Sequence, residues 1–233
     1  MERRDCLMRP LRYLWAVIRR GQGIVYHIFP DRFMKTPPGS AAATGLAPWG
    51  GSRPSRESFY GGTLKGIRER LPYISSLGAD YIYLNPVYRS RSNHRYDVDD
   101  YTRVDDLLGT GGDDMRELTR EAHGLGGIRV ILDVVFNHTS VRHPRFLEFM
   151  ERGNDWYVRV PRARRKSGTY FPGYETFEGH AGMPKLNHRS QAVIDMIRQT
   201  IRYYVEEWGG IDAVRVDVGG HSLPPRSLQG TEV

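Results

Sequence analysis

The chain has 233 residues, 39% hydrophobic and 26% charged, which is ordinary for a soluble globular protein of one large domain or two small ones. A single cysteine, Cys6, excludes an internal disulfide bond, and no apolar stretch approaches the roughly 18 residues of a membrane span. The net charge of +7 raises the question of nucleic acid, but the densest basic run, residues 159–166, lies in a loop-like segment without any nucleic-acid-binding motif.

The first half of the chain alternates strand and helix patterns. A short apolar segment bounded by glycine and proline, residues 23–29, predicts a buried strand. Residues 34–58 are rich in Pro, Gly, Ser and Ala and predict a loop. Apolar residues at helical spacing then predict a helix over 64–77, which Pro72 should kink or interrupt. A second strand is expected at 80–84.

The second half continues the alternation after Asp113 and Asp114, which stand where a helix cap belongs. The strand expected next is residues 129–136, the helix after it begins at a Ser190 cap, and the last strand is 213–218. The segment 139–188 is too long for an ordinary connection and predicts a small inserted subdomain.

This element order indicates an α/β fold with a parallel sheet. Two architectures fit, a doubly wound sheet or part of a (β/α)8 TIM barrel. No glycine-rich G-x-G-x-x-G turn follows the first strand, which argues against a dinucleotide-binding sheet.

Polar side chains follow the strands, where barrel enzymes carry their chemistry. In the last strand Arg215 and Asp217 share a face, and His221 comes four residues later. A charged pair on a buried-looking strand is costly unless it is paired or functional. The other candidates are Tyr96 after strand two, and Asp133, Asn137 and His138 at the end of strand three. Carboxylates, histidines and an aromatic platform converging on one mouth are typical of glycoside chemistry.

At this point the chain resembles a known family. Residues 133–138 (DVVFNH) and 215–221 (RVDVGGH) resemble two conserved blocks of the α-amylase family, glycoside hydrolase family 13. Residues 26–33 (YHIFPDRF) and 59–67 (FYGGTLKGI) match its first strand and first helix. Residues 183–187 (MPKLN) resemble a further block in its neopullulanase, cyclomaltodextrinase and maltogenic amylase form. The resemblance covers about residues 23–221, as the N-terminal half of the catalytic barrel.

The resemblance implies a role for each matching residue. Asp217 would be the nucleophile of a retaining glycosidase, and Arg215 would keep it ionised because a nearby positive charge favours a charged carboxylate. Asp133 would orient Arg215, although a purely structural ion pair explains Asp133 equally well. Tyr96 would stack under the sugar, while His138 and His221 would bond its hydroxyls. Asn137 would hold the insertion, sometimes through calcium in relatives.

The resemblance also predicts the division of the chain. The parts are an extension at 1–22, the first part of the barrel at 23–138 with about four strands, an inserted subdomain at 139–188, a barrel continuation at 189–221 and a tail unlike the family at 222–233. The family's general acid follows a later strand, so we expect a truncated chain that lacks it. No cofactor is required, and residues 34–39 offer no oxygen ligands suited to calcium.

The expected activity is therefore hydrolysis or transglycosylation of α-1,4 or α-1,6 bonds in α-glucans, maltooligosaccharides or cyclodextrins, in the cytoplasm, since the apolar run at 14–18 is too short for a signal peptide. A catalytically inactive glucan-binding remnant is the alternative. A basic nucleic-acid-binding protein is a third hypothesis and rests on charge alone; we expect no nucleic-acid or membrane partner. The oligomeric state stays open.

Overall fold

The computed structural model describes residues 23–36, 45–49, 54–55, 57–161 and 173–219. Its elements, in chain order, are β1 (Val25–Ile28), η1 (Pro30–Arg32), α2 (Leu64–Ser76), β2 (Tyr81–Leu84), β3 (Tyr88–Arg89), β4 (Asp100–Val104), α3 (Gly112–Gly124), β5 (Arg129–Val134), α4 (Pro144–Glu151), η2 (Phe177–Gly179), α5 (Gln191–Glu207) and β6 (Ala213–Val216). Within these residues, none of the helices has the length and apolar character to cross a membrane.

The centre of the fold is a parallel four-stranded sheet in the order β1-β2-β5-β6. The strands therefore stand side by side in chain order, each joined to the next through a connection long enough for a parallel crossover. The predicted α/β class with a parallel sheet is confirmed. Its carboxyl edge gathers the ends of all four strands, which is where the candidate polar residues lie.

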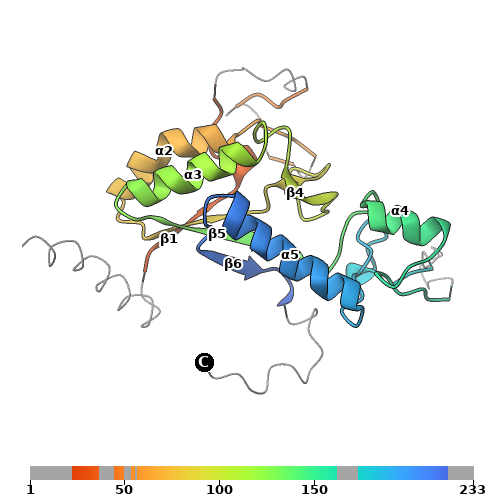
Figure 1. The fold of residues 1–233 in the computed structure, drawn as a ribbon. Helices are drawn as coiled ribbons and strands as arrows, with labels where there is room; N and C mark the ends of the chain where they lie inside the picture. Colours follow the sequence, from red (N-terminus) through yellow and green to blue (C-terminus); the bar gives the residue numbers. More distant parts are fainter. Residues whose placement is uncertain (1–22, 37–44, 50–53, 56, 162–172, 220–233) are drawn as a thin grey trace, which may run out of the picture.

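Helices cover one face of this sheet. Figure 1 shows α2 and α3 lying side by side over β1, β2 and β5, with α5 beside β6. Strand residues that alternate along each strand, such as Ile82, Leu84, Val130 and Leu132, are fully buried under the helices. Each such side chain contributes about 1.5–3 kcal/mol of hydrophobic stabilisation. The residues between them point to the opposite face of the sheet, which these helices do not cover, and polar side chains can stand there.

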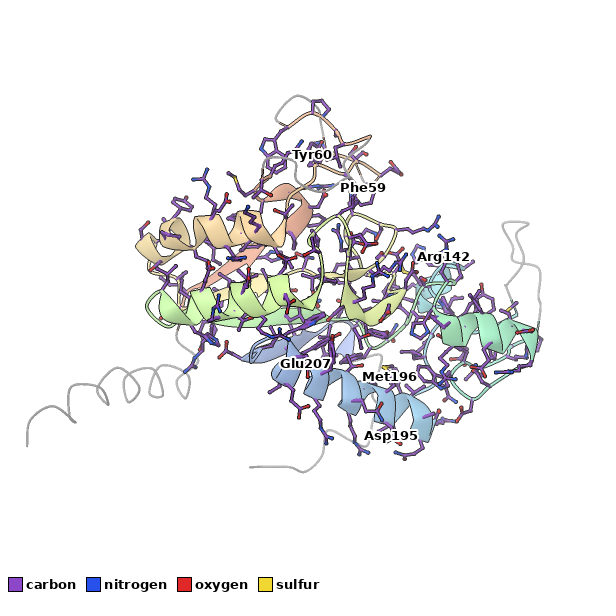
Figure 2. All side chains as sticks on the ribbon, turned by 45° about the horizontal axis from the view of Figure 1, so that its top comes forward. Phe59, Tyr60, Arg142, Asp195, Met196 and Glu207 are labelled. Atoms are coloured by element: carbon purple, nitrogen blue, oxygen red, sulfur yellow. The ribbon has the colours of Figure 1, made fainter. Side chains whose placement is uncertain are left out.

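A second, smaller hydrophobic cluster lies in the segment between β5 and α5. It contains Phe146, Phe149, Trp156, Tyr157, Tyr174, Leu186 and Val193. Met196 and Ile197 of α5 pack against both this cluster and the main core. Figure 2 shows Met196 on the side of α5 toward the rest of the molecule and Asp195 on its outer side. The helix α5 thus joins the two packed regions.

The elements differ from the sequence predictions in several places. The strands are shorter: β5 ends at Val134 and β6 at Val216. The cap of α3 is Gly111, with Asp113 and Asp114 inside the first turn, where their charges favour the positive helix end. The helix α2 continues through Pro72.

The predicted Ser190 cap is confirmed in detail. Ser190 caps α5, because its hydroxyl accepts from the Val193 amide at 3.3 Å. Thr63 caps α2 in the same way through Gly66. The antiparallel hairpin β3-β4 and the helix α4 were not predicted.

The glycine pair before α2 fixes the first loop against η1. A Cβ on Gly62 would stand 2.1 Å from the Pro30 carbonyl oxygen, so only glycine permits this approach. The buried Asp31 carboxylate accepts from the amides of Tyr60 and Gly61 at 3.0 and 3.2 Å. These contacts explain the FYGG pattern as a structural one and hold the loop beside the strand ends.

Candidate active site

Asp133 is the centre of the candidate site. It lies on β5 opposite Arg215 of β6 in the sheet register, and its side chain is completely buried. Arg215 Nη1 donates to Asp133 Oδ1 at 3.0 Å and to Oδ2 at 3.1 Å. The pairing follows from alternation, because both residues point away from the helix-covered face.

The same arginine atom also holds Asp217. Arg215 Nη1 donates to Asp217 Oδ1 at 2.6 Å, and the Asp217 amide continues the sheet ladder by donating to the Val134 carbonyl at 2.9 Å. Burial works to lower the pKa of Arg215, but its hydrogen bond and charge interaction with Asp133 outweigh burial and raise that pKa. The guanidinium is therefore a permanent cation between two carboxylates.

Asp217 is more open than Asp133, with its side chain 17% exposed. The next residue, Val218, has a backbone φ of +52°. A β-branched residue in this left-handed region is a genuine outlier that costs of order 1–3 kcal/mol, and such strain is concentrated at functional sites. Asp217 thus sits at a strained strand end with one carboxylate oxygen fixed by arginine.

Two tyrosines complete the surroundings of Asp133. Oδ2 of Asp133 accepts from the Tyr83 hydroxyl at 2.5 Å and from the Tyr96 hydroxyl at 2.6 Å. Burial, then the hydrogen bond to Asp133, raises the pKa of Tyr83 and of Tyr96, so both hydroxyls remain donors. Within the described residues, the Asp133 carboxylate thus accepts from one arginine and two tyrosine donors, which fix its position.

Tyr96 is held by a further chain of hydrogen bonds. Its hydroxyl accepts from Asn85 Nδ2 at 2.9 Å, and Asn85 Oδ1 lies 2.5 Å from His27 Nε2. The His27 ring in turn stacks on Tyr83, with ring centroids 4.6 Å apart. Three side chains from β1, β2 and the following loop thus surround the Tyr96 hydroxyl beside Asp133.

His138 lies deeper, against the segment between β5 and α5. It is 1% exposed and stacks on Phe177 at 4.9 Å. Burial lowers its pKa to about 4, against the opposing influence of the Tyr96 backbone. The imidazole is therefore neutral at neutral pH. Its buried Nε2 makes no hydrogen bond of good geometry to the described residues, which is uncommon for a buried polar atom.

Asn137 contacts the segment between β5 and α5 through its backbone. The Asn137 carbonyl accepts from Leu186 at 2.9 Å, and the side-chain nitrogen lies 3.2 Å from His138 Nδ1. In the part of the chain that the structure describes, no three His, Cys, Asp or Glu side chains are grouped to hold a metal ion. Asn137 has no acidic neighbours in such a group, so it stays a weak candidate ligand.

The structure brings together Asp133, Arg215, Asp217 and Tyr96, as the sequence predicts, with His138 and Asn137 at the adjoining strand end. His221 lies outside the described residues. Sequence reasoning missed Tyr83, Asn85, His27 and Phe177 as members of the site. For His27 and Tyr83 a signal existed, because they alternate with the buried Ile28 and Leu84 and therefore share the face of Asp133.

Comparison with known proteins adds a family match. The family model for the α-amylase catalytic domain matches residues 27–228. Maltogenic α-amylase of Bacillus acidopullulyticus is 35% identical over 205 residues, covering 83% of this chain and 33% of that protein. Neopullulanase 2 of Thermoactinomyces vulgaris is 36% identical over 204 residues, covering 84% and 34%. The chain thus spans about a third of the length of these relatives.

Solved structures give the same result. The cyclic α-maltosyl-(1→6)-maltose hydrolase of Arthrobacter globiformis superposes with a TM-score of 0.76 at 33% identity, covering 85% of this chain and 44% of that one. The type III pullulan hydrolase of Thermococcus kodakarensis gives 0.74 at 33% identity, covering 88% and 39%. By their names, these relatives act on α-glucans and related cyclic maltosides.

Proposed function

The chain belongs to the α-amylase catalytic-domain family, and from that premise we propose that it carries the nucleophile-bearing part of a retaining, α-glucan-active glycosidase site. The observation that carries the proposal is the Arg215 guanidinium, which contacts Asp133 on one side and Asp217 on the other. This arrangement orients Asp217 at the carboxyl edge of the sheet, with one carboxylate oxygen held by the arginine, as a nucleophile requires.

In this proposal Asp217 attacks the anomeric carbon of the sugar while the bond from that carbon to the leaving sugar's oxygen breaks, and the leaving sugar departs once its oxygen is protonated. The covalent glycosyl-enzyme is then attacked by water or by a hydroxyl of another sugar, which releases Asp217 with overall retention. Asp133 contributes by fixing Arg215 and Tyr96, and the Tyr96 ring forms the platform on which the sugar stacks. His138 offers its buried Nε2 to a sugar hydroxyl. His221, outside the described residues, is proposed for a similar contact.

A retaining enzyme also needs an acid about 5–5.5 Å from its nucleophile. We do not assign that role to Asp133, because its side chain is fully buried and its two oxygens are held by arginine and tyrosine donors. We assign the acid to no residue of the described part of the chain. The protonation of the leaving oxygen is thus separate from the chemistry that Asp217 performs.

The proposed architecture is the first four strands of a (β/α)8 barrel with residues 139–188 as an inserted subdomain. The sheet order β1-β2-β5-β6 supports this, since neighbouring barrel strands follow one another in sequence. The separate hydrophobic cluster around Phe146 and Tyr157 supports an insertion with a core of its own. Its contact with His138 through Phe177 would place it over the sugar site.

The proposed substrates are maltooligosaccharides and cyclodextrins joined by α-1,4 or α-1,6 bonds, in line with the names of the relatives. The test is release of reducing ends from maltoheptaose and β-cyclodextrin by the wild-type chain. Asp217→Asn should abolish release, and the exposed Asp195→Asn on α5 should leave it unchanged. Equal release by wild type and Asp217→Asn would contradict the assignment of Asp217, and absence of release by the wild type would contradict hydrolysis.

A further inference from the structure

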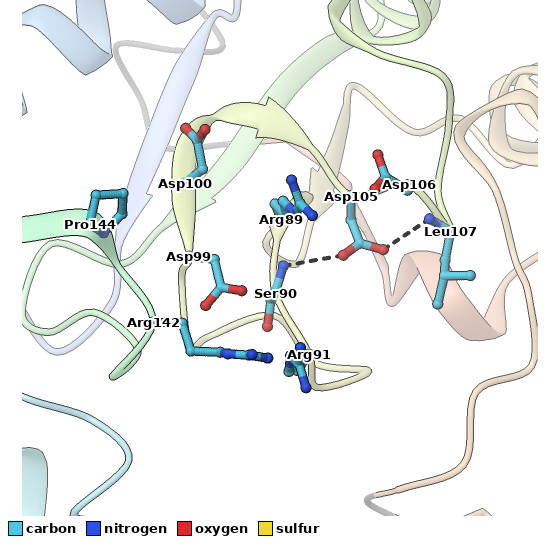
Figure 3. A pocket seen from close by; sticks show the side chains of 10 residues that line it. All are labelled: Arg89, Ser90, Arg91, Asp99, Asp100, Asp105, Asp106, Leu107, Arg142 and Pro144. Carbon is cyan, nitrogen blue, oxygen red and sulfur yellow. Dashed lines mark hydrogen bonds between the residues drawn. The ribbon is translucent and has the colours of Figure 1, made fainter. Parts of the chain in front are cut away.

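A cavity of about 460 Å3 lies apart from Asp217, where the β3-β4 hairpin meets the segment that precedes α4. Its lining is strongly charged and contains no aromatic side chain. It consists of Arg89, Ser90, Arg91, Asp99, Asp100, Asp105, Asp106, Leu107, Arg142 and Pro144 (Figure 3). The volume falls within the range of small-molecule sites.

The carboxylates of this cavity are already engaged. Asp105 is 5% exposed, forms an ion pair with the buried Arg95 and accepts from the Ser90 amide at 3.2 Å. Asp106 pairs with Arg103 at 2.8 Å. The two remaining aspartates accept hydroxyl hydrogen bonds, Asp99 from Ser140 and Asp100 from Thr102. These acidic groups therefore have donors inside the protein.

The arginines of the cavity, unlike its aspartates, have no such partners among the described residues. Within the described residues, the guanidinium groups of Arg89, Arg91 and Arg142 take part in no ion pair and in no side-chain hydrogen bond. Figure 3 shows the Arg142 side chain extended toward Arg91, from the opposite wall of the cavity. These three guanidinium groups are solvent-exposed and line one cavity, where they provide donors for an anion.

The count of charged side chains also favours an anionic ligand. Asp105 and Asp106 are neutralised by Arg95 and Arg103, which leaves Asp99 and Asp100 against Arg89, Arg91 and Arg142. The cavity with its ion-paired neighbours thus carries one net positive charge. No lysine lines it, and planar guanidinium groups match tetrahedral oxyanions through paired hydrogen bonds better than an ammonium does.

We propose that this cavity is a binding site for a phosphate group, either free orthophosphate or the phosphate of a sugar monoester. Arg89, Arg91 and Arg142 hold the phosphate oxygens, and the engaged aspartates shape the wall. The lack of an aromatic platform argues against an unphosphorylated sugar as the ligand. The site is separate from Asp217, so the proposal stands independently of the glycosidase assignment.

The test is isothermal titration calorimetry of the whole chain at constant ionic strength with orthophosphate, glucose 6-phosphate and glucose. We expect saturable binding of orthophosphate below about 10 mM and no binding of glucose through this site. Tighter binding of glucose 6-phosphate than of orthophosphate would identify a sugar phosphate as the preferred source. Equal or weaker binding would identify the free anion.

Arg91→Gln and Arg142→Gln should each weaken phosphate binding about tenfold, the loss of one charge-assisted interaction. Arg70→Gln is the matched control and should bind as wild type does, because Arg70 is an exposed residue of α2 that forms no ion pair with any residue the structure describes. Circular dichroism checks that each variant folds, and Arg91 on an exposed loop keeps the test available if Arg142→Gln does not. No saturable phosphate binding, or equal weakening by Arg70→Gln, would overturn the proposal.

Discussion

The hydroxyl of Tyr96 donates to Asp133 Oδ2 over 2.6 Å, so one buried carboxylate fixes both the proposed sugar platform and, through Arg215, the proposed nucleophile. The positions of the proposed platform and of the proposed nucleophile therefore both depend on Asp133. A change at Asp133 should disturb both, whereas a change at Tyr96 should disturb the platform first.

Tyr96→Phe keeps the ring and removes its hydroxyl. The substitution leaves Asn85 Nδ2 without its acceptor and Asp133 without one donor, and it should lower the free energy of unfolding by roughly 1–3 kcal/mol. Affinity for maltoheptaose should fall about fivefold, because the ring is no longer held in place. Calorimetric titration measures the affinity.

Tyr83→Phe is the matched control, since Tyr83 donates to the same carboxylate oxygen but its ring stacks on His27. It should destabilise the protein by a similar amount and change the maltoheptaose affinity less. Equal losses of affinity in the two variants would contradict the role of Tyr96 as the platform.

Asp133→Asn should be strongly destabilising. The carboxylate is fully buried and accepts from Arg215 and two tyrosines, and an amide would place donors against donors. Because Arg215 is half exposed and keeps Asp217, solvent reduces the cost, and we expect a loss of about 2–3 kcal/mol in urea unfolding. Asp195→Asn on the exposed face of α5 should change stability by less than about 0.5 kcal/mol. A comparably small change at Asp133 would refute the central position given to it.

Stability should depend on pH through two buried histidines. Burial lowers the pKa of His138 and of His143 to about 4. The unfolded chain binds protons at these residues below about pH 6.5, whereas the folded chain resists until about pH 4. Stability is therefore lost as the pH falls from about 6.5 to about 4, by about 2 kcal/mol per histidine between pH 7 and pH 5.

His143→Asn tests this source of pH dependence. His143 caps α4 through Nδ1, and asparagine is also a good cap. Urea unfolding at pH 7 and pH 5 should show a smaller difference for this variant than for wild type. His180→Gln, at an exposed histidine, should keep the full difference. An unchanged difference in His143→Asn would show that the histidine does not titrate as its burial requires.

Much of the fold follows from sequence periodicity. The four strands of the sheet and the three long helices were predicted because their apolar residues repeat over enough turns or alternations to be distinctive. The hairpin β3-β4 and the eight-residue α4 were missed because they are too short for a distinctive repeat of apolar residues, and packing rather than local preference forms them. The N-cap of α3 was predicted at Asp113 or Asp114 but is Gly111, because the helix begins earlier than the aspartates indicate.

Some residues of the candidate site could likewise be predicted from the sequence, and others could not. Asp133, Arg215 and Asp217 could be predicted from strand alternation and from the cost of burying charge. The Asn85 and His27 contacts could not, since they depend on the register that sets His27 beside Tyr83 and on side-chain geometry. Phe177 reaches His138 from a segment without periodicity.

The most direct test of the account is covalent labelling of Asp217. An activated α-glucosyl fluoride has a leaving group that departs without an acid, so a glycosyl-enzyme depends on the nucleophile alone. After rapid acid quenching, mass spectrometry should find one added glucosyl unit on the peptide that contains Asp217 in wild type and in Asp195→Asn, and none in Asp217→Asn. Labelling of another carboxylate, or equal labelling of Asp217→Asn, would contradict the assignment of Asp217 as the nucleophile.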